Sequence, residues 1–349
     1  MSTQAAVRQP AADRDLKKIL ARGRRGRLDV KLSPYLYISP FFLVFALIGL
    51  FPLLYTAYIA TRKWNMTMGD QGMAVAPGNP GDTAVFGNFE WALSNADFWT
   101  ALRNTFSIFL LSSGPQIAVA LALAAVLQAN LRAKTFWRMG VLLPYVVAPM
   151  AAGIIFRQVF ADNTGVVNQF LHGLGIEGIA WHGNTLASHV AVAAIVNFRW
   201  TGYNTLVFLA AMQAIPRDTY EAAVVDGAGP VRQFFSITIP MVRPTLIFVI
   251  ITSTIAGLQV FDEPQMFSIS NAYGGSGQQF LTVTQLLWRT GFVSNNPSNM
   301  GRAAAIAWLL FILIVIMAAF NFWVTRAIAS TGQARQARVR RPKRTEVAS

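Results

Sequence analysis

The feature that most constrains this chain is a series of six apolar stretches, each long enough to cross a membrane as a helix. They lie at residues 37–60, 104–128, 141–160, 188–215, 242–261 and 303–325. A helical crossing takes about 20 predominantly apolar residues. With 54% hydrophobic and 13% charged residues, the 349-residue chain is too apolar for an ordinary soluble domain. The sequence therefore predicts an all-α membrane protein, a bundle of six transmembrane helices.

Prolines interrupt several of these stretches, at Pro40, Pro52, Pro115, Pro144 and Pro149. A membrane tolerates such breaks where neighbouring helices or a water-filled path satisfy the freed carbonyl groups. The prolines therefore indicate a transporter rather than a simple anchor.

Lys and Arg are concentrated in four segments, residues 1–34, 132–138, 217–243 and 326–344, which hold 22 of the 29. Cytoplasmic loops carry such an excess. We therefore expect a multi-pass membrane protein with both termini in the cytoplasm. This topology also explains the net charge of +14 more simply than a nucleic-acid-binding arm does.

The expected organisation has three parts. Residues 1–34 form a basic cytoplasmic tail, residues 35–328 the transmembrane domain, and residues 329–349 a second basic cytoplasmic tail.

One patterned polar segment, residues 216–244, separates the fourth and fifth apolar stretches. Asp218 and Glu221 have the spacing of a capping box, which predicts a short helix. Gly227 suits the left-handed end of that helix, and Pro230 suits the first turn of another. Two short apolar faces are expected, Tyr220 with Ala223 and Val224, and Val231 with Phe234 and Phe235.

This segment closely resembles the EAA loop of bacterial ABC importer permeases. The matching positions are Glu221, Ala222, Ala223, Gly227, Ile237 and Pro240, with Ile239 where the family usually has Leu. Asp226, Gly227 and Ala228 match its carbohydrate-importing branch. The resemblance implies that residues 216–241 form a helix-turn-helix coupling loop, which sits in a cleft of a separate ATPase and passes its closure to the spans.

Further family-like residues extend from Phe86 to the last span. They include Phe86-Gly87-Asn88-Phe89, Phe98-Trp99, Asn104-Thr105, Leu143-Pro144-Tyr145, Pro149 and Asp162-x-x-Gly165-x-x-Asn168. Beyond Phe261-Asp262, the order Gly274-Gly275, then Phe280-x-Thr282, is similar to the family's outer segment, with Ser276 in place of its proline. That segment is expected to meet an external binding protein; the alternative is a plain connecting loop.

The resemblance implies a type I ABC importer permease fold. It also implies the permease subunit of an ATP-driven, binding-protein-dependent sugar importer of the maltose type, for which an oligosaccharide is the expected cargo. The implied partners are a second homologous permease, an ABC ATPase dimer and an extracytoplasmic sugar-binding protein. ATP and Mg are expected on the ATPase, and this chain is expected to bind no cofactor.

Arg199 lies within the otherwise apolar fourth stretch. A charge at mid-membrane costs several kcal/mol unless it is paired or hydrated. Arg199 is therefore expected either to pair with Asp262 or Glu263 or to line an aqueous path. In related maltose permeases, spans on either side of the EAA loop hold the sugar. Counted from Glu221, similar distances fall near Trp200 and Tyr203 on one side and near Ser253, Gly257 and Val260 on the other. Because aromatic faces and amide groups suit sugars, the residues predicted to line the path are Tyr203, Asn204, Ser253 and Gln259, together with Arg199.

Catalytic motifs are absent from the sequence, including G-x-x-x-x-G-K-[ST], H-E-x-x-H and G-x-S-x-G. The lack of cysteine and the presence of only three histidines argue against a metal site. The chain is therefore expected to be non-catalytic. The alternative is an ion-coupled secondary transporter or a channel, although acidic residues occur only near a span boundary, at Asp262 and Glu263, and no inverted repeat is detectable.

Overall fold

The computed structural model describes residues 32–75, 77, 83–129, 132–268, 273–293 and 299–339, and of residues 325–339 only the backbone. Residues 1–31 of the predicted N-terminal tail and residues 340–349 of the C-terminal tail lie outside this part. The chain divides into two units, residues 1–58 and 59–349.

The described part of the first unit belongs to one helix, Leu32–Ala60, which is long and apolar enough to cross a membrane. Within it, the π-helical turn η1 (Ala46–Leu50) leads into α2 (Phe51–Ala60). Pro52 follows this turn directly, and because proline has no N–H, it interrupts the α-helical hydrogen bonds there.

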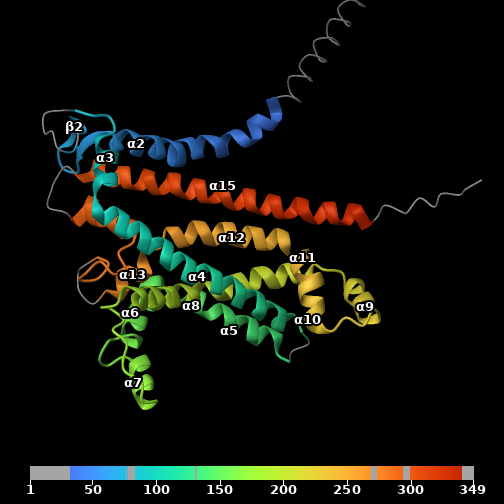
Figure 1. The fold of residues 1–349 in the computed structure, drawn as a ribbon. Coiled ribbons are helices and arrows are strands. Elements are labelled where there is room, and N and C mark those ends of the chain that lie inside the picture. Colours follow the sequence, from blue (N-terminus) through green and yellow to red (C-terminus); the bar gives the residue numbers. More distant parts are fainter. Residues whose placement is uncertain are drawn as a thin grey trace, which may run out of the picture. The chain divides into compact units, whose positions relative to one another are not determined.

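The second unit is mostly helical (Figure 1). Its elements are β1 (Arg62–Asn65), β2 (Gly69–Met73), α3 (Gly87–Ser94), α4 (Ala96–Gln128), α5 (Lys134–Val146), α6 (Pro149–Val159), α7 (Val166–Gly173), α8 (Thr185–Gln213), α9 (Arg217–Val225), α10 (Pro230–Gln233), η2 (Phe234–Thr238), α11 (Ile239–Met241), α12 (Arg243–Leu258), α13 (Asp262–Phe267), α14 (Val283–Trp288), η3 (Arg289–Val293) and α15 (Asn299–Val339).

Helix α8 is at the centre of this unit, where it packs against α4, α5, α6, α12 and α13. Helix α12 in turn packs between α4 and α15 (Figure 1). At Gly202, α5 approaches α8 so closely that an added Cβ would lie 1.9 Å from the carbonyl oxygen of Val141. Only a residue without a side chain allows this approach of the two backbones.

The predicted span at residues 141–160, in which Pro144 and Pro149 were expected as breaks, is divided between two helices. Helices α5 and α6 meet at an angle of 89°. The break has a local cause, because Pro149 disfavours the helical conformation in the preceding residue, and Ala148 has an extended ψ of 137°. A second bend, of 71°, separates the segment Pro230–Met241 from α12.

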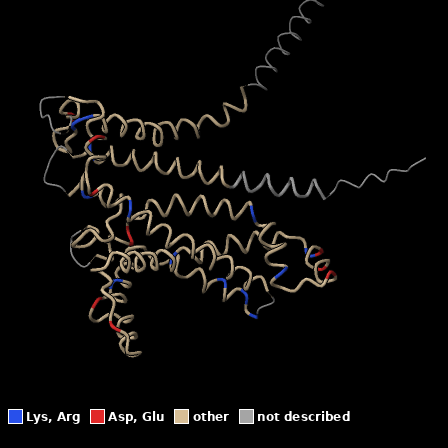
Figure 2. Tube along the Cα trace, viewed as in Figure 1, with Lys and Arg blue, Asp and Glu red and all other residues tan. Residues whose placement is uncertain are grey.

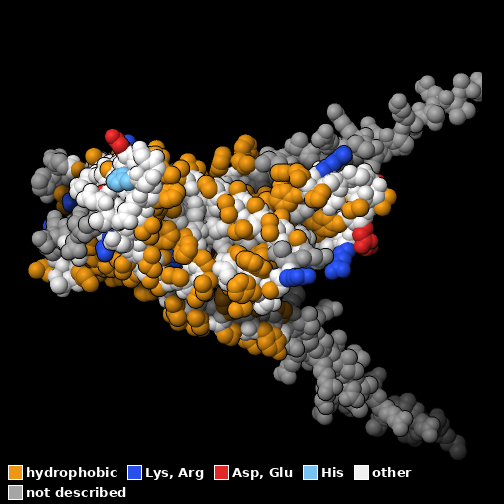
Figure 3. All heavy atoms as spheres, turned by 90° about the horizontal axis from the view of Figure 1, so that it is seen from below, with side chains coloured by type: hydrophobic (Ala, Val, Ile, Leu, Met, Phe, Trp, Pro, Cys, Tyr) orange, Lys and Arg blue, Asp and Glu red, His pale blue; other side chains and the backbone are white. Residues whose placement is uncertain are grey.

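Among the described residues, three helices are long and apolar enough to cross a membrane, or up to five if each bent pair is one span. The predicted span at residues 188–215 corresponds to the 29-residue helix α8. This helix is long enough, but polar residues such as Asn197, Arg199 and Asn204 lower its mean hydropathy below that of a typical span. Figure 3 shows hydrophobic side chains over much of one face, with the visible charged side chains near its ends.

A small antiparallel hairpin of β1 and β2 was not predicted, because its second strand, with the sequence GDQGM, has no strand-like pattern. The Asn65 Oδ1 atom organises the turn by accepting hydrogen bonds from the backbone N–H and the hydroxyl of Thr67, both at 2.8 Å. Gly69 and Gly72 adopt positive φ angles of 74° and 103°. These local contacts make a turn that strand propensity alone does not indicate.

Candidate functional site

A cavity of about 370 Å³ lies among α4, α8, α12 and the start of α13. All five residues predicted to line a substrate path border it: Arg199, Tyr203, Asn204, Ser253 and Gln259. They come from α8, from α12 and from the residue that follows α12. The structure thus brings together side chains that are up to 60 positions apart in the sequence.

The Arg199 guanidinium forms an ion pair with Glu263, with 2.5 Å between Nη1 and Oε1. Both residues are buried, at 8% and 5% exposure. Of the two partners considered from the sequence, the structure selects Glu263 and leaves Asp262 on the cavity wall. Because Arg199 and Glu263 also line the cavity, pairing and lining are not alternatives here.

An amide and hydroxyl groups add hydrogen-bonding capacity to this cavity. The Asn204 Nδ2 atom donates to Gln116 Oε1 at 3.3 Å, and Ser112 and Ser113 lie nearby on α4. Gln116 was not predicted as a cavity residue, although a glutamine within an apolar span is a detectable signal.

Aromatic rings border the same region. Tyr203 stacks on Tyr145 with ring centroids 5.1 Å apart, and Trp200 makes edge contacts with both rings. Tyr203 keeps 37% of its surface exposed. Aromatic faces combined with amide and hydroxyl groups can hold a polar, hydroxyl-bearing molecule, because the faces pack against C–H groups while the polar groups exchange hydrogen bonds.

The segment at residues 216–241 folds as the helices α9, α10 and α11, with the π-helical turn η2 between the last two. Helix α9 ends at Gly227 as predicted, with φ of 73°. The Gly227 N–H donates to the Val224 carbonyl at 3.0 Å, and the Ala228 N–H donates to the Ala223 carbonyl at 2.8 Å. This pair of bonds is a Schellman motif.

Pro230 occupies the first turn of α10, as predicted. The predicted capping box is wrong, because α9 is preceded by Pro216 and has no side-chain cap. Pro216 has an extended ψ of 137°, which is suited to the entry into a helix, so the prolyl backbone sets this start without an Asp218 cap.

The predicted coupling residues are mostly exposed. Glu221, Ala222, Asp226, Gly227 and Pro240 are exposed, and Ala223 is buried. The Tyr220 hydroxyl hydrogen-bonds the Thr238 hydroxyl at 2.9 Å, which ties α9 to η2.

The two apolar faces expected in this segment are only partly buried. Ala223 is buried, and Phe234 packs on a core cluster that contains Phe208 and Met212. Besides Met241, at 45%, four large apolar side chains of this segment remain exposed, Val224 at 64%, Val225 at 87%, Val231 at 72% and Phe235 at 63%. We call these four residues the loop tip.

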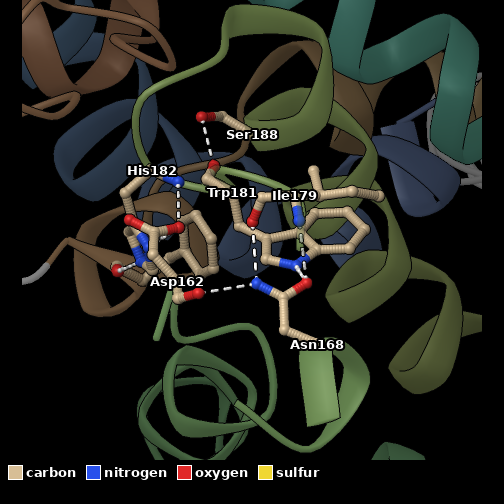
Figure 4. A network of polar contacts seen from close by, with 7 residues as sticks. Asp162, Asn168, Ile179, Trp181, His182 and Ser188 are labelled. Carbon is tan, nitrogen blue, oxygen red and sulfur yellow. Dashed lines mark hydrogen bonds and ion pairs between the residues drawn. The ribbon is translucent and has the colours of Figure 1, made fainter. Parts of the chain in front are cut away.

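At the opposite end of α8, Asn168 organises the segment after α6 (Figure 4). Its Nδ2 atom donates to the carbonyl oxygens of Asp162 and Ile179, while its Oδ1 atom accepts from the Ile179 N–H and the Trp181 ring. The Asp162 carboxylate accepts from the His182 N–H at 3.0 Å. The sequence motif Asp162-x-x-Gly165-x-x-Asn168 is therefore a structural clamp.

The outer segment after Phe261 is anchored in a similar way. Asn104 on α4 donates to the carbonyl oxygens of Gln278 and Leu281, and His189 on α8 contacts the Gln279 carbonyl at 2.8 Å. Thr282 and Gln285 form a capping box at the start of α14. This part of the chain is thus packed onto the helices.

Among the described residues, no group of three or more His, Cys, Asp or Glu side chains could hold a metal ion.

Comparisons with known proteins agree with this architecture. Residues 19–330 match the family described as binding-protein-dependent transport system inner membrane component. The arabinooligosaccharides transport system permease protein AraP of Halalkalibacterium halodurans is 30% identical over 306 residues, which cover 87% of this chain and 90% of AraP. The lactose transport system permease protein LacF of Rhizobium radiobacter is 33% identical over 243 residues, 69% of this chain and 80% of LacF.

A solved structure shares the fold. It is the bacterial alginate ABC transporter in complex with an alginate pentasaccharide-bound periplasmic protein, with a TM-score of 0.69 and 19% sequence identity, and the match covers 86% of this chain and 98% of that chain. The chain therefore belongs to the family of binding-protein-dependent transport system inner membrane components, and it is a non-catalytic permease subunit of an ABC transporter.

Proposed function

We propose that this chain forms half of the translocation path of an ATP-driven sugar importer and couples to its ATPase through residues 216–241. The observation that carries this proposal is the position of that loop between the two helices that supply the polar cavity wall. Helix α8 ends at Gln213 and α9 begins at Arg217, while α11 ends at Met241 and α12 begins at Arg243. A displacement of the loop is passed along both helices to the cavity.

The cavity suits a sugar. Tyr203 and Trp200 provide faces for C–H packing, and Asn204, Gln116 and Ser253 provide groups that hydrogen-bond hydroxyls. AraP and LacF are named for neutral sugars, and the structurally similar transporter for alginate, an acidic polysaccharide. We assign an oligosaccharide cargo on this basis, delivered by an extracytoplasmic sugar-binding protein.

The exposed loop tip suits the ATPase cleft. Four large apolar side chains on one short segment are the kind of surface that a protein partner covers. ATP and Mg bind to the ATPase dimer. When that dimer closes, the loop moves with it, and the cavity opens outward to receive cargo; release of ADP and phosphate restores the inward-facing state. A second homologous permease completes the path.

The proposed orientation places both tails, residues 1–34 and 329–349, in the cytoplasm, together with this loop, which is part of the transmembrane domain at 35–328. Figure 2 shows described basic residues near α9 and α5, at the end of the second unit opposite α7. They include Arg132, Lys134, Arg138, Arg217, Arg232 and Arg243. The positive-inside rule puts this end in the cytoplasm.

Two experiments test the proposal. Full complexes in proteoliposomes, with the binding protein supplied outside, are expected to take up a neutral oligosaccharide only when ATP is present at the ATPase.

The native chain has no cysteine, so single cysteines report topology cleanly. In intact cells an impermeant thiol reagent is expected to label Glu177→Cys, in the exposed segment after α7, and to spare Arg232→Cys on α10. ATP-independent uptake, or labelling of Arg232→Cys alone, would overturn the proposal.

A further inference from the structure

The cavity wall holds an unusual balance of charges. Among the described residues that line it, one is basic, Arg199, and two are acidic, Asp262 and Glu263. With all three ionised, the cavity wall contributed by this chain carries one net negative charge. The one cation, the Arg199 guanidinium, is already paired, because its Nη1 atom lies 2.5 Å from Glu263 Oε1.

Burial makes the Arg199–Glu263 ion pair costly to separate. Arg199 and Glu263 are both more than nine-tenths buried, so separating them would leave two uncompensated charges in a low-dielectric region. An anionic cargo would have to compete with Glu263 for the guanidinium, and it would also face Asp262. An uncharged cargo needs no such exchange, since a guanidinium has five N–H donors and one carboxylate cannot use them all.

We infer that Glu263 sets the charge selectivity of this cavity: by neutralising Arg199 it reserves the cavity for uncharged sugars and excludes sugar acids. This inference rests on the proposed sugar-import function and narrows its cargo to neutral oligosaccharides. Arg199 then donates hydrogen bonds to hydroxyl groups while Glu263 balances its charge. Asp262 adds repulsion against carboxylates.

The test measures selectivity rather than activity, because a purely structural ion pair would alter yield without altering the preference between two sugars. The assembled complex in nanodiscs, without binding protein, is incubated with a radiolabelled neutral trisaccharide or with a uronate trisaccharide of the same length. Omitting the binding protein removes its own selectivity. The readout is the ratio of uronate to neutral sugar bound.

For the wild type we expect the ratio of bound uronate to bound neutral sugar to be about 0.1 or lower. A difference in binding free energy of about 1.4 kcal/mol, which we assign to one competing charge contact, corresponds to a factor of ten. Glu263→Gln frees the guanidinium and is expected to raise the ratio by about tenfold. Asp262→Asn keeps the ion pair and is expected to raise it by a smaller factor, which keeps the test decisive if Glu263→Gln fails to assemble. Asp97→Asn is the matched control, because it removes the acid of the Arg289–Asp97 ion pair outside the cavity lining, and the ratio is expected to stay at the wild-type value.

Equal binding of both sugars by the wild type would overturn the inference. So would an unchanged ratio in the cavity variants, or a shift in Asp97→Asn as large as theirs. In all these outcomes, ATP-dependent uptake of the neutral trisaccharide by wild-type proteoliposomes would leave the importer function standing. Failure of that uptake as well would remove both.

Discussion

The cavity and the loop at residues 216–241 are built in opposite ways, although α8 and α12 join them. In the cavity, Arg199, Asn204 and Gln116 have side-chain partners within the chain, and the walls are largely buried. The loop keeps its form through backbone geometry, with a Schellman motif at Gly227, and it leaves its apolar tip exposed.

The difference indicates where each region finds its stability. In the cavity, Arg199 is paired with Glu263 and Asn204 with Gln116, so a change there is expected to act on folding and on cargo. The loop tip is exposed, so a change there is expected to act on the proposed assembly with a partner and to leave the folded chain intact. The following predictions test this division, beginning with the largest effect.

Arg199→Leu is expected to be the most damaging single change. It leaves the buried Glu263 carboxylate without its partner, which costs about 3–5 kcal/mol for a broken buried ion pair. We expect a strong loss of complex yield, measured by size-exclusion chromatography of detergent-solubilised membranes. In the double variant Arg199→Leu/Glu263→Leu no charge remains unpaired, so the yield is expected to recover. Normal yield of the single variant would show that Glu263 finds other compensation.

Val225→Ser is expected to weaken assembly without weakening the fold. Val225 is 87% exposed, so its replacement removes no packing within the chain. If it docks in the ATPase cleft, its loss costs about 1–2 kcal/mol of association, a factor of about 5 to 30. Titration of the ATPase onto the permease pair measures this factor. Ile176→Ser, at a half-exposed position beyond α7, is the control and is expected to leave the association unchanged. An equal loss in both variants would argue against a specific role for the loop tip.

Tyr220→Phe removes the hydrogen bond to Thr238 and is expected to have the smallest effect. One such bond contributes about 1 kcal/mol, so local opening of residues 217–241 becomes about fivefold easier. Hydrogen exchange of that segment is expected to speed up, while exchange around residues 199–204 is expected to stay at the wild-type rate. The double variant with Thr238→Val is expected to add little. Equal acceleration in both regions would mean that loop and cavity open as one unit.

The sequence predicted the coupling segment best where the backbone determines the outcome. Gly227 and Pro230 have conformational preferences that act locally, and both adopt the predicted geometry. The Asp218–Glu221 capping box failed because Pro216 provides a competing way to begin the helix. The exposure of Val224 and Phe235 was not predictable from their spacing, because apolar periodicity does not distinguish a core face from a face left open to a partner.

For the cavity, the sequence indicated the set of lining residues but not which acid pairs with Arg199. Its residues were predicted as a set from a family resemblance and from polar residues in apolar stretches, and the structure places them around one cavity. The choice of Glu263 over Asp262 required the three-dimensional packing of α13 against α8, since the two acids are adjacent in sequence. The break between α5 and α6 was predicted in part, because Pro149 was identified as an interruption, but neither the proline nor hydropathy indicates the bend angle of 89°.

The most direct test of the central claim asks whether loop movement reaches the cavity. A single cysteine at Ser253, which lines the cavity on α12, is placed in the full complex, and its labelling from the outside is followed with and without a non-hydrolysable ATP analogue. The same measurement is made with Gly227→Val, which strains the left-handed turn by about 1–2 kcal/mol, and with Gly229→Val, whose φ of −65° accepts a side chain in open space. We predict that nucleotide increases labelling in the wild-type and Gly229→Val backgrounds but not in Gly227→Val. An undiminished increase in Gly227→Val would contradict coupling through residues 216–241.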